Sequence, residues 1–135
     1  MGGFMAKFRF QDLEIWQMAI ELGNQLFDIA DILERKHLYR FAEQVRSAGM
    51  SMSNNIAEGS GCTSNKEFAR FLDISRRSVF ENANIVILLC RRKLLDERTQ
   101  SNLLESFDIL SRRISSFKKT LRRSPMLSAL PSRPG

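Results

Sequence analysis

Apolar side chains recur along most of the chain at spacings of three and four residues, which is the period of an amphipathic α-helix. This pattern predicts four helices, over about residues 12–33, 39–57, 64–93 and 96–123. Prolines occur only at positions 125, 131 and 134, so none interrupts these segments. Because short connections join long helices, we expect an all-α, antiparallel up-down-up-down four-helix bundle.

The same pattern divides the chain into an N-terminal arm over residues 1–11, the bundle over residues 12–123 and a proline-containing tail over residues 124–135. A chain of 135 residues favours one domain and can bury a core without a disulfide or a metal. Cys62 and Cys90 lie far apart, which argues against a zinc site. The longest apolar run, Ile85–Cys90, is far too short to span a bilayer, so we expect a cytoplasmic protein without membrane contact.

The predicted helices differ in how much apolar surface they present. The fourth carries a regular seam formed by Leu103, Phe107, Leu110, Ile114, Phe117 and Leu121. The first is apolar around much of its circumference, with a main stripe formed by Trp16, Ile20, Gly23, Phe27 and Ala30. A surface helix in a monomer needs an apolar arc of only about 100°. The excess fits either a centrally placed helix in a monomer or association between identical subunits, and we favour the second.

The connection between the second and third predicted helices is the most distinctive stretch of the sequence. Its expected structural residues are Asn55, Glu58, Gly59, Ser64 and Glu67. Gly59 suits the left-handed position just past a helix, and Glu58 at the helix end needs a partner such as Lys66, Arg70 or the amides that open the next helix. A Ser-x-x-Glu capping box then begins the third helix. The stretch lacks the GxxxxGK[ST] pattern of a phosphate-binding loop, so a structural corner is favoured over an anion site.

An ordered set of short motifs accompanies this corner: FQDL at 10–13, WQxA at 16–19, QVR at 44–46, SNNIAEG at 53–59 and KEFxRFL at 66–72. With these motifs the chain resembles the four-helix-bundle proteins of the 23S rRNA intervening-sequence family over residues 8–122. The resemblance implies an antiparallel four-helix bundle and a ring-shaped homopentamer. Relatives of the family include the accessory variability protein of diversity-generating retroelements, which binds nucleic acid and works with a reverse transcriptase. Family members often carry a second basic residue where Ser47 follows Arg46 here, so no role of such a residue carries over.

Positive charge is concentrated at the C-terminal end of the chain. The net charge is +6, and residues 111–135 hold seven of the 21 basic residues and none of the 15 acidic ones. In an up-down-up-down bundle this end lies near the corner between the second and third helices. Such a surface can neutralise phosphates without reading bases, and it predicts contact with RNA or DNA. The expected contact residues are Arg112, Arg113, Lys118, Lys119, Arg122, Arg123, Lys66 and Arg70.

No aromatic side chain is expected among these exposed cations, so stacking of single-stranded bases is not predicted. Enzymatic chemistry has little support either. His37 is the only histidine, and with Glu34 it forms a single Glu-x-x-His spacing at a helix end, without the matching carboxylates of a di-iron bundle. A Ser-His-Asp arrangement has no basis in the sequence. We therefore expect no enzyme activity, no cofactor and no metal.

Together these features predict a homo-oligomeric, nucleic-acid-binding accessory or scaffold protein. The resemblance implies a pentamer and suggests a reverse transcriptase as the partner. The alternative is a protein-interaction module without affinity for nucleic acid. Its recruiting element would be the tail, where Met126, Leu127 and Leu130 form a short apolar motif between prolines.

Overall fold

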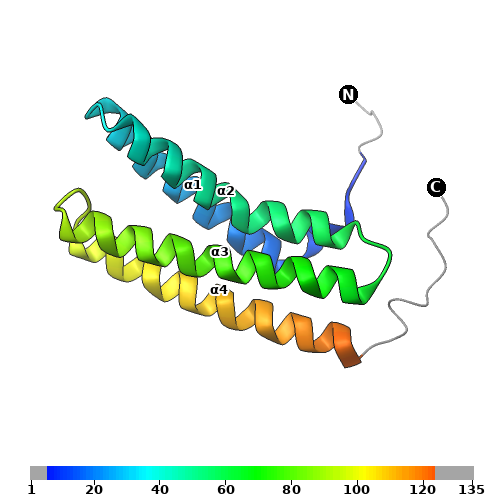
Figure 1. Ribbon diagram of the computed structural model, residues 1–135. Coiled ribbons are helices and arrows are strands. Elements are labelled where there is room, and N and C mark those ends of the chain that lie inside the picture. The colour runs from blue at the N-terminus through cyan, green and yellow to red at the C-terminus, as the bar shows by residue number, and fades with distance from the viewer. Residues whose placement is uncertain (1–5, 124–135) are drawn as a thin grey trace.

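The computed structural model describes residues 6–123, and within them the chain forms four α-helices and one short 3-10 helix. The bounds are η1 Arg9–Asp12, α1 Glu14–Arg35, α2 Tyr39–Ser60, α3 Asn65–Arg91 and α4 Glu97–Arg123. Successive helices run antiparallel and pack side by side, so the predicted four-helix bundle is confirmed (Figure 1). The predicted tail over residues 124–135 lies outside the described residues.

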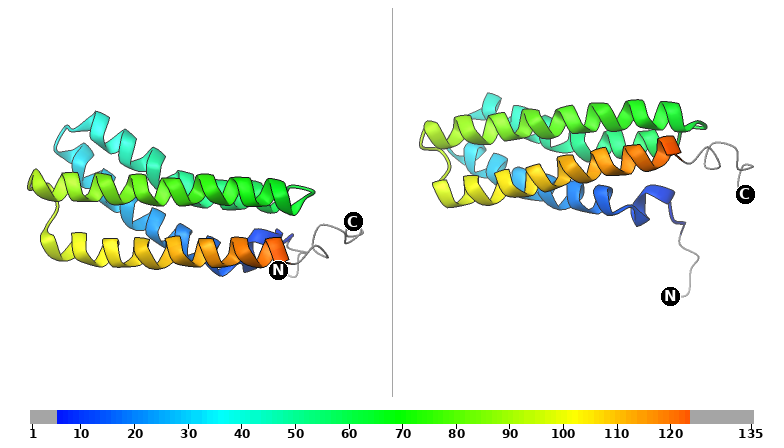
Figure 2. Two further views of the ribbon diagram at one scale, coloured as in Figure 1. Left: turned by 60° about the horizontal axis from the view of Figure 1, so that its bottom comes forward. Right: turned by 90° about the horizontal axis from the view of Figure 1, so that it is seen from below.

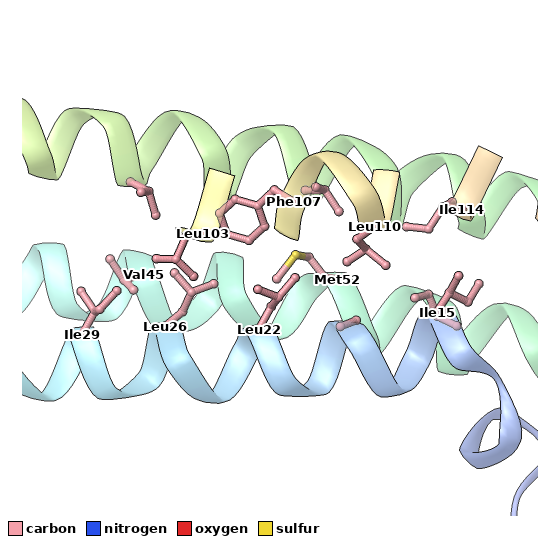
Figure 3. Packing of buried hydrophobic residues seen from close by; sticks show 14 of the residues in the cluster. Ile15, Leu22, Leu26, Ile29, Val45, Met52, Leu103, Phe107, Leu110 and Ile114 are labelled. Carbon is pink, nitrogen blue, oxygen red and sulfur yellow. The ribbon is translucent and has the colours of Figure 1, made fainter. Parts of the chain in front are cut away.

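All four α-helices contribute to one continuous apolar core (Figure 3). The predicted seam of α4 faces this core, with Phe117 half-buried and its other members buried. On α1 the core stripe differs from the predicted one, because Gly23 and Ala30 are buried but Trp16, Ile20 and Phe27 lie toward the rim. The residues of α1 that fill the core are Ile15, Ala19, Leu22, Leu26, Ile29 and Leu33.

The bundle consists of two helical hairpins that diverge toward one end. The α1–α2 loop and the α3–α4 loop lie apart, whereas the α2–α3 turn lies near the start of α1 and the end of α4 (Figures 1 and 2). Near the open end Arg46 of α2 forms ion pairs of 2.8 Å with Asp31 and with Glu34 of α1. Hydrogen bonds to these two carboxylates raise the pKa of Arg46 above its ordinary value. The α1–α2 hairpin is therefore held together near its open end by this ion-pair cluster.

The helices α2 and α3 are also joined by hydrogen bonds between buried polar groups. The two backbone acceptors lie on α2, and the side chains that donate to them lie on the facing side of α3. The bonds run from Ser75 Oγ to the Met52 carbonyl (2.8 Å), from Asn82 Nδ2 to the Ala48 carbonyl (2.7 Å) and between the hydroxyls of Ser51 and Ser78 (2.7 Å). These bonds offset much of the cost of burying the groups that take part in them, whereas the buried Asn82 Oδ1 has no hydrogen-bond partner among the described residues.

The helices α1 and α3 end in the same way, on a residue with left-handed backbone conformation. His37 has a φ of 65° and Lys93 a φ of 62°. In each loop the next amide closes back on the helix, with Leu38 N–H donating to the Leu33 carbonyl and Leu94 N–H to the Leu89 carbonyl, both at 2.9 Å. This is the Schellman arrangement, in which glycine normally occupies the left-handed position.

Replacing His37 and Lys93 by glycine is therefore expected to stabilise the fold by about 0.5–1 kcal/mol at each site, because glycine adopts this conformation without strain. Urea unfolding of His37→Gly, Lys93→Gly and the double variant measures the effect. Lys36→Gly is the matched control, since Lys36 has a φ of −89° and gains nothing from glycine. A double variant no more stable than the parent chain would contradict the expectation.

Candidate nucleic-acid interface

The corner between α2 and α3 is built by close contact between the two helices. Helix α2 continues through Gly59 to Ser60, so the predicted role of Gly59 as a left-handed residue beyond the helix is wrong. Gly59 is buried, and a Cβ atom at this position would lie 2.7 Å from Phe68 Cδ1 and 2.8 Å from Phe71 Cβ. The absence of a side chain thus lets the last turn of α2 touch the first two turns of α3.

The start of α3 is capped as predicted, but only in part. Ser64 Oγ accepts a hydrogen bond of 3.1 Å from the Glu67 amide, which is the first half of a capping box. The Glu67 carboxylate accepts from the Arg70 guanidinium at 3.1 Å, and this bond raises the pKa of Arg70 above its ordinary value. Glu67 is thereby engaged with its own helix, as an exposed ion pair.

Two further residues of the predicted corner behave differently from expectation. Asn55 Nδ2 donates to the Ser51 carbonyl at 2.8 Å and to Ser51 Oγ at 3.1 Å, so this amide bonds back along α2 and not into the turn. Glu58 is exposed, and within residues 6–123 its carboxylate forms no ion pair with Lys66 or Arg70. The carbonyl of Glu58, by contrast, accepts from the Gly61 amide at 3.1 Å and helps to close the turn.

The corner also holds the end of α4 and the segment that precedes α1. Asn65 Nδ2 donates to the Leu121 carbonyl of α4 at 3.1 Å. Arg9 donates to the Ser60 carbonyl at 3.4 Å, and its Cζ lies 5.3 Å from the centroid of the Phe68 ring. The topology therefore brings the first, second, third and fourth helices together at one end of the bundle, as predicted for an up-down-up-down arrangement.

The eight predicted contact residues separate into two groups of four. The first group forms ion pairs within the chain: Arg112 with Asp108 (3.0 Å), Arg113 with Glu14 (2.6 Å), Arg70 with Glu67 (3.1 Å) and Lys118 with Asp73. The second group is exposed and forms no ion pair within residues 6–123: Lys66, Lys119, Arg122 and Arg123. The second group therefore carries the positive charge that is least neutralised.

The ion-paired cations are not equivalent to one another. The Arg112 side chain is 79% exposed, so its pair with Asp108 is weak and solvent competes for both partners. The Lys118 side chain is only 20% exposed and fastens α4 to Asp73 of α3. Arg112 thus remains accessible to a ligand, whereas Lys118 belongs mainly to the packing of α3 against α4.

Cations from α3 and α4 meet in a groove near the corner. Lys66, Arg70 and Asp73 line it from α3, and Leu121 and Arg122 line it from α4. The proximity of Arg122 to Lys66 and Arg70 agrees with the expectation from topology. We call the outer side of these two helices the α3–α4 basic face; it comprises Lys66, Arg70, Arg76, Arg77, Arg112, Lys119, Arg122 and Arg123, together with the ring of Phe80.

Helix α3 contributes residues to this face that the sequence analysis missed. Arg76 and Arg77 are exposed, and Phe80 has 56% of its surface exposed. The Arg76 guanidinium lies over the Phe80 ring, with Cζ 5.1 Å from the ring centroid. Since Asp73 points to Lys118 of α4, Arg76 and Phe80 follow on the same side of α3, one and two turns further along. An aromatic ring therefore does lie among the exposed cations, contrary to the expectation.

The described residues give no indication of metal chemistry or of a membrane span. Within residues 6–123 no group of three His, Cys, Asp or Glu side chains is arranged to hold a metal ion. His37 lies in the α1–α2 loop, where its Nδ1 shares a hydrogen bond of 2.7 Å with the Tyr39 hydroxyl. None of the helices in this part of the chain combines the length and the apolar character needed to cross a bilayer.

The fold and this surface define the chain as an all-α, antiparallel four-helix bundle with a basic outer face. Residues 11–116 match the family described as 23S rRNA-intervening sequence protein. Because the match spans more than half of the chain, the protein belongs to that family. The matched segment includes Lys66, Arg70 and Arg112 but ends before Lys118 and the basic residues that follow it. No curated protein matches the sequence.

Proposed function

We propose that the protein is a non-enzymatic, oligomeric accessory or scaffold protein that binds RNA or DNA through the α3–α4 basic face. The observation that carries this proposal is the groove in which Lys66 and Arg70 of α3 meet Arg122 of α4. A polyanion that lies across such a surface releases its condensed counterions, which favours binding without selecting a sequence. The name of the family, which refers to an intervening sequence of ribosomal RNA, supports RNA as the ligand.

Association between identical subunits is the second part of the proposal. It is supported by apolar side chains at the rim of α1 and α2, where Ile20 is 36% and Met50 is 47% exposed. Trp16 and Phe27 are half-buried on the same rim, and the Phe10 ring extends it by packing on Trp16 with centroids 5.0 Å apart. A second copy that covers this rim removes it from water. The resemblance gives the number of copies as five, which would carry a total charge of about +30 and attract polyanions strongly.

The proposed protein partner is a reverse transcriptase, on the strength of the resemblance to the accessory variability protein. The bundle would then serve as a basic surface that holds a nucleic-acid template or product beside the enzyme. Pull-down of a reverse transcriptase encoded near the protein's own gene, with and without nuclease treatment, tests a direct contact between the two proteins. Loss of the pair on nuclease treatment would reduce the partnership to a shared ligand.

Neutralising Lys66, Lys119, Arg122 and Arg123 to glutamine is expected to weaken the binding of a short RNA strongly. Each lost phosphate contact lowers the slope of log K against log salt by about 0.7–0.9, so four contacts lower it by about 3. Glutamine keeps the helical propensity of the replaced residues, so the fold should persist. Fluorescence anisotropy over a series of salt concentrations measures both the affinity and the slope.

The matched control neutralises four exposed cations at the opposite end of the bundle: Arg35, Lys36, Arg40 and Arg98. This control changes the net charge by the same amount, so it separates a local surface from the overall field of the protein. Equal losses in the two variants would refute a localised interface, and no loss in either would refute nucleic-acid binding by this face. Sedimentation of all three proteins tests the second part, since a single-copy particle would contradict oligomerisation.

A further inference from the structure

We infer that Phe80 and Arg76 form a stacking site for an unpaired nucleobase, so that the α3–α4 basic face takes single-stranded in preference to fully paired nucleic acid. The inference rests on the proposed function and deepens it by naming the class of ligand. It depends on three observations: the exposure of the Phe80 ring, the position of the Arg76 guanidinium and the place of both on the bundle.

The exposure of Phe80 is unusual among the phenylalanines of its helix. Phe68 is 2% exposed and Phe71 is half-buried, whereas Phe80 keeps 56% of its surface in water. A single exposed apolar residue is ordinary by itself. Here, however, the ring carries a guanidinium with Cζ 5.1 Å from its centroid. An arginine over an aromatic ring provides a planar surface for stacking together with a positive charge for phosphate.

The neighbouring residues of α4 leave this ring uncovered. Asp73 pairs with Lys118, and Ile87 lines a groove together with Leu104, so the antiparallel helices are aligned at two levels. Midway between these levels Phe80 lies opposite Ser111, whose side chain is small and buried. No large side chain of α4 is therefore placed to cover the ring, and the ring faces outward beside the α3–α4 seam.

The cations lie where they can contact the phosphates of a single-stranded nucleic acid that stacks one base on Phe80. The groove with Lys66 and Arg122 lies toward the corner, and Arg76 and Arg77 lie between that groove and Phe80. A single strand can lay its phosphates along these cations and turn one base onto the ring. In a duplex the faces of the bases are stacked on one another, so the ring has no base face to contact.

A second copy of the chain is the other occupant to consider for an exposed ring. A two-fold contact at Phe80 is disfavoured, because Arg76, Arg77 and Arg112 would meet the same cations of the second copy. An aromatic ligand that is also an anion satisfies both the ring and the cations. A nucleotide base on its phosphate backbone has this combination, which is why the geometry points to single-stranded nucleic acid.

The test compares a short oligouridine with a backbone of the same length that lacks its bases, both bound to the full chain. The parent protein is expected to bind the oligouridine about 5- to 150-fold more tightly, the range for one stacked base. Phe80→Leu should abolish this difference while leaving the affinity for the base-free backbone and the salt slope unchanged. Phe80→Trp should retain it, and quenching of the new indole by the bound base gives a second readout.

Leu88→Ala is the matched control, because Leu88 is an apolar residue of the same helix that is 45% exposed. Equal affinity of the parent for the two ligands, or a difference that survives in Phe80→Leu, would overturn the stacking site. If the stacking site is overturned but the charge-neutralised variant loses binding, the proposed function still stands. A parent protein that binds neither ligand would contradict the proposed function itself. A changed sedimentation mass of Phe80→Leu with unchanged oligouridine binding would make the ring a contact between copies and would also overturn the inference.

Discussion

Gly59→Ala is expected to lower the free energy of unfolding by about 2–3 kcal/mol, although alanine is ordinarily the better helix former. The added Cβ would come within 2.7 Å of Phe68 Cδ1 and 2.8 Å of Phe71 Cβ. Phe68 is buried, and the Cβ of Phe71 moves only with the backbone of α3. The contact can therefore be relieved only by separating the ends of α2 and α3, which loosens the corner.

Gly61→Ala is the matched control two residues away. A Cβ at Gly61 would lie 3.5 Å from the Glu58 carbonyl oxygen, which is an ordinary contact, and the φ of −87° suits any residue. Because alanine lowers the conformational entropy of the unfolded chain, the free energy of unfolding of the Gly61→Ala variant is expected to be unchanged or raised by up to about 1 kcal/mol. Urea unfolding of both variants measures the contrast, and equal effects would contradict the close approach described for Gly59.

Phe107→Ala is expected to cost about 3–5 kcal/mol, the range for removing a buried aromatic ring. Phe107 is 2% exposed and lies in the core between the two hairpins, in the layer of labelled side chains that includes Leu22 and Met52 (Figure 3). A domain of this kind has a total stability of about 5–15 kcal/mol, so this one ring accounts for a large share. Thermal unfolding followed by circular dichroism measures the loss.

Phe80→Ala removes the same ring from the surface and serves as the control. Because Phe80 is 56% exposed, its removal is expected to cost less than about 1 kcal/mol. The difference between the two variants isolates the effect of burial from that of the ring itself. A cost for Phe80→Ala as large as that for Phe107→Ala would show that the ring is covered, and it would remove the basis for a stacking site.

The fold was predictable because several local features of the sequence indicate the same four helices. Apolar spacing marks the four helices, and the capping serine at position 64 opens α3 as expected. The prediction of the core residues on α4 was also correct, since the apolar arc of this helix is narrow and only one of its faces can turn inward. On α1 the arc is wide, and periodicity alone does not say whether Ile15 or Trp16 faces the core. The packing of α2 and α4 decides between them.

The end of α2 was misjudged for a different reason. Two glycines stand close together, at positions 59 and 61, and either can end a helix. The contact of Gly59 with two phenylalanines of α3 keeps the first of them helical. Such a contact joins residues from different helices, and no local signal in the sequence reports it.

The candidate interface was predictable only as a concentration of charge. Which cations stay free depends on carboxylates from other helices, since Asp73 engages Lys118 and Glu14 engages Arg113. Phe80 was missed because a single phenylalanine outside the apolar stripe of a helix carries no signal of its own. Its exposure reflects its place on the outer side of α3, which emerges only when α3 and α4 are aligned.

The hydrogen bonds between α2 and α3 give the bundle a way to reject a wrong register. Apolar residues spaced by three and four would pack almost as well if α3 slid past α2 by one turn, about 5.4 Å. The slide would carry Ser75 and Asn82 away from their carbonyl partners, and each stranded polar group costs about 1–3 kcal/mol. Asn82 is 1% exposed, so bulk water does not replace the lost bond. Two uncharged side chains inside the bundle thereby keep Gly59 opposite Phe68, and so maintain the alignment on which the outer surface depends.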